Sequence, residues 1–313
     1  MISAEFLDFA SVGSLDELDL SSLKTVLPAL RLWPHTARDE LHPRIHDAEV
    51  LILNAQRIDA AAFAAAPKLK CIGTTSTGTN HIDLSVARQR RIAVINIVDY
   101  CTPSVAQHVF AVLLALTHHL VEYDRDLKAG LWQRAPLSLV HHPIRELGGL
   151  VLGIVGYGHL GHAVADLARA FGMEVRIANR PGGTAEVGRV DHWDLLPEVD
   201  VLTLHCPLNA ATRNLIGRAE LARMKKDAIL INTARGGLVD AEALAEALRA
   251  GRLGGAGIDV LAEEPPASGN PLLAPDLHNV IVTPHTAWAA RESRQRGLDQ
   301  LAAKLTIWAA KKR

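Results

Sequence analysis

The sequence predicts an α/β protein with two doubly wound domains, each built on a parallel sheet. Its 313 residues suggest two domains, at about 150 residues per domain. Short β-rich runs alternate with Ala- and Leu-rich helical stretches, which is the pattern of βαβ units. The alternation forms two series, one ending before residue 98 and one starting at Leu150, and a long helical stretch separates them.

The first series is expected to form a small flavodoxin-like sheet. Its five strands read ISAEFLDF, LRLWPHT, AEVLILNA, KCIGTT and IAVINI. Helices are expected around Ser21–Leu30, Ile58–Ala66 and Leu84–Gln89. Five strands joined by four connections are enough for a doubly wound sheet.

One long helix is expected between the two series, from Thr102 to Ala129. Thr102 is a capping residue, Pro103 suits a first helical turn, and no breaker follows before Gly130. A helix of about 27 residues would be about 40 Å long, a length that suits a strut between two domains.

The second series starts at Leu150 with LVLGIVG and a helix at His159–Phe171. Its later strands read MEVRIAN, DVLTLHC, AILINTA, GGAGIDV and NVIVTP. The final helix, about Arg291 to Ala310, follows the end of that series, so we expect it to pack back on the first domain. The predicted domains are therefore residues 1–98 plus 288–313, and residues 99–287, with a cleft between them.

Charge and hydropathy argue against nucleic-acid and membrane partners. Lys and Arg number 33 against 34 Asp and Glu, and a protein that follows a phosphate backbone would need a basic surplus. The longest clean apolar run, Val109–Leu116, falls short of the roughly 20 residues of a membrane-spanning helix. The N-terminal residues MISAEFLDFA do not read as a signal peptide.

Cysteine and histidine placement predicts a cytoplasmic protein without a metal site. Cys71, Cys101 and Cys206 are sparse and widely spaced, as expected for reduced thiols. Among the 15 histidines, the pair His118-His119 closes a helical segment, where cations are favoured. The pair His141-His142 lies in a polar loop, and no Glu or His stands at a convincing metal-ligand spacing.

The segment GYGHLG at residues 156–161 fits the dinucleotide-binding pattern GxGxxG. It follows an apolar strand and opens a helix, which is the context that the pattern requires. Gly156 would permit the tight turn, Gly158 would let a pyrophosphate approach the backbone, and Gly161 would let the helix pack on the strand. The alternative is a glycine-rich turn that binds no ligand.

The end of the next strand predicts which dinucleotide binds. An NAD site usually has Asp or Glu there to accept hydrogen bonds from the adenosine ribose. This chain has Asn179-Arg180, with no acid to repel a 2′-phosphate and an arginine to bind it. The sequence therefore favours NADP(H) over NAD(H). The alternative is that Arg180 points to solvent and the site takes NADH.

Three later strands each run into a loop with an ionisable residue. Arg235 lies in AILINTARGGLVD, Glu264 in GGAGIDVLAEEPP and His285 in NVIVTPHTAW. In open α/β sheets, ligands bind beyond the carboxyl ends of the strands. The three loops could therefore converge on one substrate, although any one of them alone would more often be an ordinary surface charge.

With these motifs in this order and spacing, the chain resembles the NAD(P)-dependent D-2-hydroxyacid dehydrogenases from about Leu32 to Trp308. The segments STGTNHIDL, YCTPSVAQHVFAVLLALT and TPHTAW are most similar to glycerate dehydrogenases, also called hydroxypyruvate reductases. The resemblance implies a substrate domain in residues 1–98 plus 288–313, a Rossmann dinucleotide domain in residues 99–287, and a homodimer.

The resemblance also implies site residues. The catalytic residues would be Arg235, His285 and the glutamate directly before proline, which is Glu264 and not Glu263. The backbone N–H groups of Ser76, Thr77 and Gly78 would hold the substrate carboxylate, next to Arg235 and His285. Besides the three glycines, the cofactor contacts would be His159, Leu160, Asn179, Arg180, Cys206, Pro207, Thr212, Thr233, Ala234 and Asp259. Asp259 would meet the nicotinamide carboxamide. The chain departs from the family at Asn179, where many members of the family have Asp.

The expected activity is that of an oxidoreductase: hydride transfer between NAD(P)H and a small 2-oxo acid, which interconverts hydroxypyruvate or glyoxylate with D-glycerate or glycolate. One alternative is a dehydrogenase of the same fold for 3-phosphoglycerate or D-lactate. A phosphorylated substrate would call for extra basic residues, and STGTNHIDL has none apart from His81. The other alternative, a nucleotide-sensing corepressor, predicts a missing catalytic residue, but Arg235, Glu264 and His285 are all present.

Overall fold

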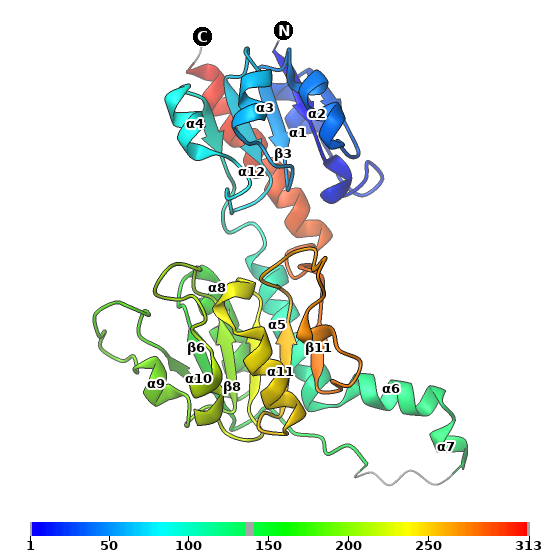
Figure 1. The fold of residues 1–313 in the computed structure, drawn as a ribbon, viewed down its shortest axis with the longest axis vertical. Helices are drawn as coiled ribbons and strands as arrows, with labels where there is room; N and C mark the ends of the chain where they lie inside the picture. Colours follow the sequence, from blue (N-terminus) through cyan, green and yellow to red (C-terminus); the bar gives the residue numbers. More distant parts are fainter. Residues whose placement is uncertain (1, 135–140, 312–313) are drawn as a thin grey trace. The chain divides into compact units, whose positions relative to one another are not determined.

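The computed structural model describes residues 2–134 and 141–311. The chain divides into two compact units, residues 1–101 with 288–313, and residues 102–287 (Figure 1). The first unit thus ends at Cys101, whereas the sequence analysis places this boundary after residue 98. Each unit contains one parallel sheet, which confirms the predicted fold class.

The sheet of the first unit has the order β2-β1-β3-β4-β5, with every neighbouring pair parallel. This is the flavodoxin-type order, in which the chain reverses direction across the sheet after β2. Each of the five predicted runs corresponds to one strand, although β2 begins one residue before its run, at Ala29. The bounds are Ser3–Phe6 (β1), Ala29–Leu32 (β2), Val50–Leu53 (β3), Cys71–Thr74 (β4) and Ala93–Ile95 (β5).

The helices of this unit include one that the sequence analysis missed, α2 (Arg38–Ile45). Its sequence contains Pro43, which lacks an N–H donor and normally argues against a helix interior. Leu41 and Ile45 are buried, so tertiary packing outweighs the proline. The remaining helices are α1 (Ser21–Val26), α3 (Ala60–Ala65), α4 (Leu84–Gln89), the 3₁₀ turn η1 (Phe9–Ser11) and the C-terminal α12 (Arg291–Ala310).

Helix α12 shares a core with the first sheet. Leu298, Leu301 and Leu305 are buried in the same cluster as β1 residues. Leu301 lies against Gly73 of β4, where an added Cβ would come within 3.0 Å of the leucine side chain. A small residue on the strand therefore lets the C-terminal helix approach closely.

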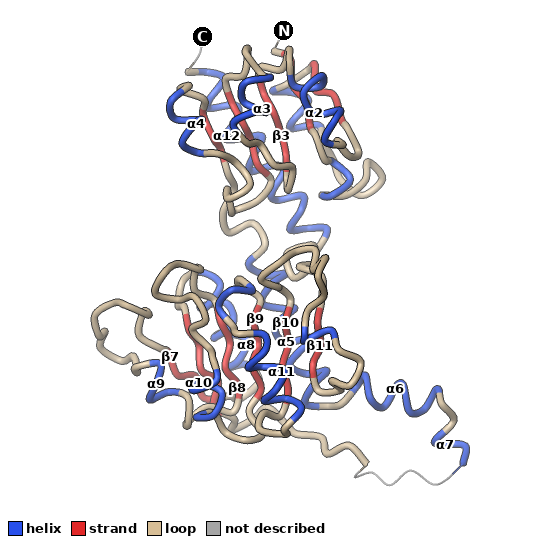
Figure 2. Tube along the Cα trace, viewed as in Figure 1, coloured by secondary structure: helices blue, strands red, loops and turns tan. Residues whose placement is uncertain are grey.

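The sheet of the second unit has the order β11-β10-β9-β8-β6-β7 and is also fully parallel. Its strands are drawn in red in Figure 2. Beyond β7, a single bridge joins Ala178 to Val190 in place of a further strand. If that bridge is counted as a reduced third strand, the order agrees with the dinucleotide-binding sheet. The bounds are Val151–Val155 (β6), Glu174–Ile177 (β7), Val201–Leu204 (β8), Ile229–Asn232 (β9), Gly255–Ile258 (β10) and Val280–Val282 (β11).

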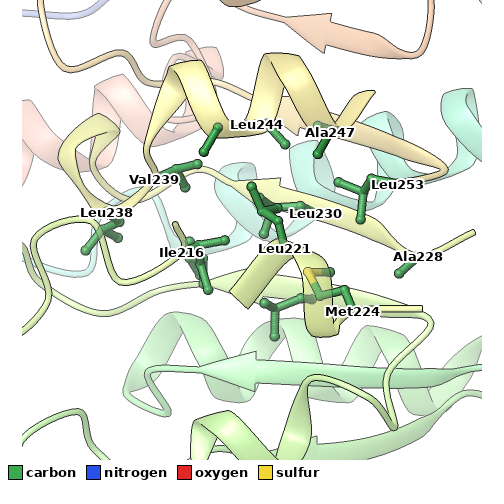
Figure 3. Close-up of a cluster of buried hydrophobic side chains, with 14 of the residues drawn as sticks. Ile216, Leu221, Met224, Ala228, Leu230, Leu238, Val239, Leu244, Ala247 and Leu253 are labelled. Atoms are coloured by element: carbon green, nitrogen blue, oxygen red, sulfur yellow. The ribbon is translucent and has the colours of Figure 1, made fainter. Parts of the chain in front are cut away.

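Helices cover both faces of this sheet. One face is packed by α5 (Thr102–Thr117) and α8 (His159–Ala170), and the opposite face by α9 (His192–Leu195), α10 (Arg218–Arg223) and α11 (Ala241–Arg249). Figure 3 shows the core on the face covered by α9, α10 and α11, where Leu230 of β9 lies among Leu221, Leu244 and Leu253. Burial on both faces explains why the strands read as nearly continuous apolar runs. Two 3₁₀ turns complete the unit, η2 (Gly236–Leu238) and η3 (Pro271–Leu273).

The predicted long helix is wrong, because the structure divides it into α5 and α6 (Leu120–Lys128), bent by 56°. His119 adopts a left-handed conformation at φ 52° and ends the regular helix. Helix α6 buries none of its residues, and it extends from the unit with α7 (Leu131–Arg134) (Figure 1). In the described residues no single helix has the length and apolarity to cross a membrane, although α5 and α6 together meet that test as a bent pair.

A histidine with one buried ring nitrogen, His205, directly follows β8 in this unit. The His205 Nε2 lies 3.0 Å from the Thr203 hydroxyl, whereas Nδ1 is buried and has no hydrogen-bond partner in the described part of the chain. Burial lowers the pKa of His205 to about 4, because a charged imidazolium would lose its hydration. The folded protein therefore keeps this ring neutral.

This shift predicts acid sensitivity. The unfolded chain takes up a proton near pH 6.5, but the folded chain does so only near pH 4. Between these values the free energy of unfolding falls as pH falls, by about 1.4 kcal/mol per pH unit from this group. We expect His205→Gln to lose less stability than the wild type between pH 7 and pH 5, as measured by urea unfolding. Equal losses in the two proteins would contradict this role.

Candidate functional site

The glycine turn after β6 has the geometry that a dinucleotide needs. Gly156 has φ 100°, and a Cβ there would lie 2.5 Å from the backbone of His205 and Cys206. A Cβ at Gly161 would lie 2.3 Å from the Gly156 carbonyl oxygen, so only glycine lets α8 pack this closely. Gly158, in contrast, has open space where its Cβ would be. The turn is therefore closed on the protein side and open at Gly158.

The open side of this turn fits a pyrophosphate. Gly158 is the N-cap of α8, and His159 and Leu160 form the first helical positions. A helix N-terminus offers backbone N–H donors and a partial positive charge to an anion. A second polar atom available to a ligand is the Thr233 hydroxyl, which is buried and lacks a hydrogen-bond partner within residues 2–134 and 141–311. A buried hydroxyl left in this state fits a site completed by a bound molecule.

The segment after β7 distinguishes Asn179 from Arg180. The Asn179 side chain accepts a hydrogen bond from the Glu186 N–H at 2.9 Å, and its backbone N–H donates to the Val190 carbonyl at 2.7 Å. Asn179 thus organises the loop that returns to Val190. Arg180 is exposed, and no described residue forms an ion pair or side-chain hydrogen bond with it. Its charge is available to a ligand at this strand end.

The loop after β8 brings Cys206 and Thr212 to the site as structural residues. Burial raises the pKa of the Cys206 thiol to about 11, so this cysteine is neutral at physiological pH. The Thr212 hydroxyl donates to the Pro207 carbonyl at 2.7 Å and accepts from the Asn209 N–H at 2.8 Å. Because that hydroxyl already both donates and accepts, Thr212 stabilises the loop conformation. Pro207, near the start of the loop, is exposed.

The loop after β9 carries Thr233, Ala234 and Arg235, and it is held by a residue that the sequence analysis missed. Asn232 is 1% exposed, accepts from the Ala234 N–H at 3.1 Å and donates to the Arg235 carbonyl at 2.9 Å. Arg235 itself is exposed. The next residue, Gly236, packs directly on the loop after β10, since a Cβ there would overlap the backbone of residues 261–262.

The loops after β10 and β11 bring Glu264 and His285 together. The Glu264 Oε2 lies 2.6 Å from the His285 Nδ1, and Oε1 accepts from the Leu261 N–H at 2.7 Å. Both side chains are partly exposed. The peptide bond between Glu264 and Pro265 is cis. A carboxylate that bonds Nδ1 fixes the orientation of the imidazole, which is the arrangement of an oriented general acid or base.

Asp259 fixes the loop that carries His285. Its buried carboxylate accepts from the Thr283 hydroxyl at 2.5 Å and from the N–H groups of Thr286 and Ala287 at 2.9 and 3.0 Å. His108 of α5 places Nε2 3.0 Å from the same Thr283 hydroxyl. The sequence predicts that Asp259 meets the nicotinamide, and it gives no sign of His108 or Thr283, because no local spacing links residues so far apart in the chain.

The Ser76–Gly78 loop belongs to the first unit, after β4. The Ser76 hydroxyl donates to the Gly78 carbonyl at 2.8 Å, and the Asn96 side chain donates to the Thr77 carbonyl at 2.8 Å. These two hydrogen bonds stabilise the loop through the carbonyl oxygens of Thr77 and Gly78. In the described ranges, no protein acceptor is assigned to the backbone N–H of Thr77 or Gly78. Both groups can therefore donate to an anion.

In the second unit, the structure brings together at one sheet edge nearly all the residues expected there. The turn at Gly156 contacts the loop after β8, and Gly236 contacts the loop before Glu264. Arg235, Glu264 and His285 follow β9, β10 and β11, which are neighbours in the sheet. The edge thus combines the N-terminus of α8 with an oriented Glu–His pair and an exposed arginine.

Comparison with known proteins agrees with this arrangement. Residues 110–287 match the model of the D-isomer specific 2-hydroxyacid dehydrogenase, NAD binding domain. The chain is 42% identical to a glycerate dehydrogenase of Methylorubrum extorquens, over 84% of this chain and 83% of that protein. It is 36% identical to a hydroxypyruvate reductase of Blautia hydrogenotrophica, over 84% and 83% of the two chains.

Solved structures extend the likeness to the whole chain. The TT0316 protein of Thermus thermophilus has a TM-score of 0.86 and 36% identity, and the match covers 100% of this chain and 98% of that one. The likeness in sequence and in fold thus extends over both units. The chain belongs to the family of D-isomer specific 2-hydroxyacid dehydrogenases, oxidoreductases with an NAD-binding domain.

Proposed function

We propose that this enzyme reduces a small 2-oxo acid, hydroxypyruvate or glyoxylate, to the corresponding 2-hydroxy acid. The observation that carries the proposal is the 2.6 Å contact between Glu264 and His285 at the dinucleotide-binding edge of the sheet. The relatives named glycerate dehydrogenase and hydroxypyruvate reductase support the choice of substrate. The turn at Gly158 and the Thr233 hydroxyl are the groups that would hold the dinucleotide.

Each proposed catalytic residue has a separate task. Arg235 would bind a carboxylate oxygen of the substrate and polarise its ketone, since a guanidinium offers several fixed N–H donors. His285 would donate a proton to the developing alkoxide from Nε2, while Glu264 holds Nδ1 and stabilises the charged ring. The bound nicotinamide supplies the hydride chemistry. The N–H groups of Thr77 and Gly78 are proposed to bind the substrate carboxylate, whereas the expected Ser76 N–H already donates to the Thr74 hydroxyl at 3.3 Å.

The proton-donor role of His285 predicts a large effect on turnover. We expect His285→Ala to lower kcat on hydroxypyruvate by about 100-fold or more, the usual scale for general acid catalysis. Dinucleotide affinity, measured by fluorescence titration, should change little. His278→Ala, which removes an exposed histidine just before β11, is the matched control and should keep wild-type turnover. Near-wild-type turnover of His285→Ala would remove this residue from the mechanism.

The Glu264 carboxylate should support turnover by orienting the His285 ring. Its Oε2 lies 2.6 Å from the His285 Nδ1, and Glu264→Ala removes that acceptor. We expect Glu264→Ala to lower kcat on hydroxypyruvate, although by less than His285→Ala, because a general acid works only when its ring is held toward the substrate. Glu263→Ala changes the exposed neighbouring glutamate and should keep wild-type kcat. An unchanged kcat in Glu264→Ala would mean that Glu264 does not orient His285.

We further propose that the enzyme prefers NADPH to NADH. Arg180 is exposed and free of acidic partners in the described chain, at the strand end where the adenosine ribose would lie. Asn179 adds no negative charge, and its side chain is held by the Glu186 N–H. One charge-assisted contact to the 2′-phosphate contributes about 1.5–3 kcal/mol, or roughly 10- to 150-fold in affinity.

Arg180→Ala should therefore reduce the NADPH/NADH ratio of kcat/KM, mainly through KM, because the contact is remote from the reacting carbon. Asn179→Asp should move the preference toward NADH by repelling the phosphate. Arg176→Ala is the control, since that arginine lies on β7 and is 3.6 Å from Glu174. A wild-type preference for NADH, or an unchanged ratio in Arg180→Ala, would refute the proposal.

A steady-state comparison of hydroxypyruvate, glyoxylate and pyruvate with both dinucleotides tests the substrate. We expect the first two to be reduced with higher kcat/KM than pyruvate. A preference for pyruvate would instead favour the D-lactate alternative. The homodimer, the cytoplasmic location and the assignment of residues 1–98 plus 288–313 to substrate binding stay predictions.

A further inference from the structure

We propose that Asp126, His141 and His142 form a zinc-binding site in the second unit, separate from the dehydrogenase site. The Asp126 Oδ2 lies 2.8 Å from the His142 Nε2 and 3.8 Å from the His141 Nε2. One ligand atom from each residue lies within 4.8 Å of the others. No residue of the cluster is among the proposed catalytic, substrate or dinucleotide contacts.

The donor set suits Zn²⁺. Two imidazoles and one carboxylate, with a water molecule in the fourth position, form an established zinc coordination. Zinc–ligand bonds of about 2.0–2.1 Å in a tetrahedron place neighbouring ligand atoms about 3.4 Å apart. The two contacts to Asp126 bracket that value, so small side-chain movements would admit the ion. His141 is half exposed, which leaves a path for the ion and room for the water.

The residues around the cluster hold two of the ligands in place. The Arg125 Nε donates to the Asp126 Oδ1 at 3.3 Å and leaves Oδ2 directed at the histidines. The Tyr123 hydroxyl donates to the His142 carbonyl at 3.0 Å, and its ring packs edge-on against the His142 ring at 4.9 Å. The His119 ring stacks on the His142 ring at 5.6 Å between ring centroids. Metal sites commonly have such outer partners that orient their ligands.

The site would give α6 an anchor that packing does not supply. Asp126 lies on α6, a helix with no buried residue, and the histidines lie 15 and 16 positions later in the chain. A metal ion that bridges the two segments binds the folded chain and not the unfolded one, and so stabilises the folded state by mass action. Zinc binding should therefore stabilise the folded enzyme without taking part in the reaction.

Calorimetric titration of the chelator-treated full-length enzyme with ZnCl₂ tests the proposal. The wild type should bind one zinc ion per chain at this site. In His142→Ala and Asp126→Asn the zinc affinity of the site should fall by more than about 100-fold, which exceeds the usual effect of losing an outer partner. Arg125→Ala should weaken binding by about 10- to 100-fold. His46→Ala is the matched control, since His46 is exposed and forms a two-residue pair with Asp47 at 3.4 Å.

Two further readouts separate this site from zinc bound elsewhere, for example at the Glu264–His285 pair. Cobalt(II) should give the visible absorption of a tetrahedral site in the wild type and in His46→Ala, but not in His142→Ala. The reductase activity of His142→Ala without added metal should equal that of the wild type. Should His142→Ala fail to fold by circular dichroism, Asp126→Asn decides the matter. Equal zinc affinity in the wild type and a folded cluster variant, or no zinc binding by the wild type, would overturn the proposal.

Discussion

The buried carboxylate of Asp259 holds the arrangement on which the dehydrogenase site depends. Three donors from residues 283–287 converge on it, and the Asp259 carbonyl accepts a further bond from the His285 N–H at 2.8 Å. His285 stands at φ 55°, a left-handed conformation that costs a non-glycine residue about 1–3 kcal/mol. The hydrogen bonds offset that cost, because a buried charge is stable only when its partners stay in place. The imidazole is thus directed at Glu264 before any substrate binds.

The same constraint connects the site to the core of the second unit. Thr283 bonds both Asp259 and His108, and His108 lies on α5, whose apolar face packs against the sheet and α8. The glycine turn at 156–161 leads into the N-terminus of α8 and packs on His205 and Cys206, which follow β8. The glycine turn and His285 are therefore positioned by one packed framework, to which α5 contributes both apolar packing and the His108 contact.

The residues at the strand ends fall into two groups that differ in burial and in accessible charge. Asp259 is fully engaged in holding a loop, Cys206 is kept neutral by burial, and the Thr212 hydroxyl is used within its own loop. Arg180 and Arg235 remain exposed at the same edge. The residues that shape the edge are thus buried and hydrogen-bonded, whereas those proposed to meet the anionic ligands keep their charge accessible.

The sequence by itself determined the two parallel sheets, the glycine turn and the three strand-end residues Arg235, Glu264 and His285. Strands buried on both faces read as apolar runs, and the residues that follow them gather at one edge whenever the strands are parallel. Only the tertiary structure decided the break at His119, the helix containing Pro43, the network of His108 with Asp259, and the meeting of Asp126 with His141 and His142. The reason is physical: these features rest on contacts between residues distant in the chain, and packing in three dimensions overrides the local propensity from which sequence patterns are read.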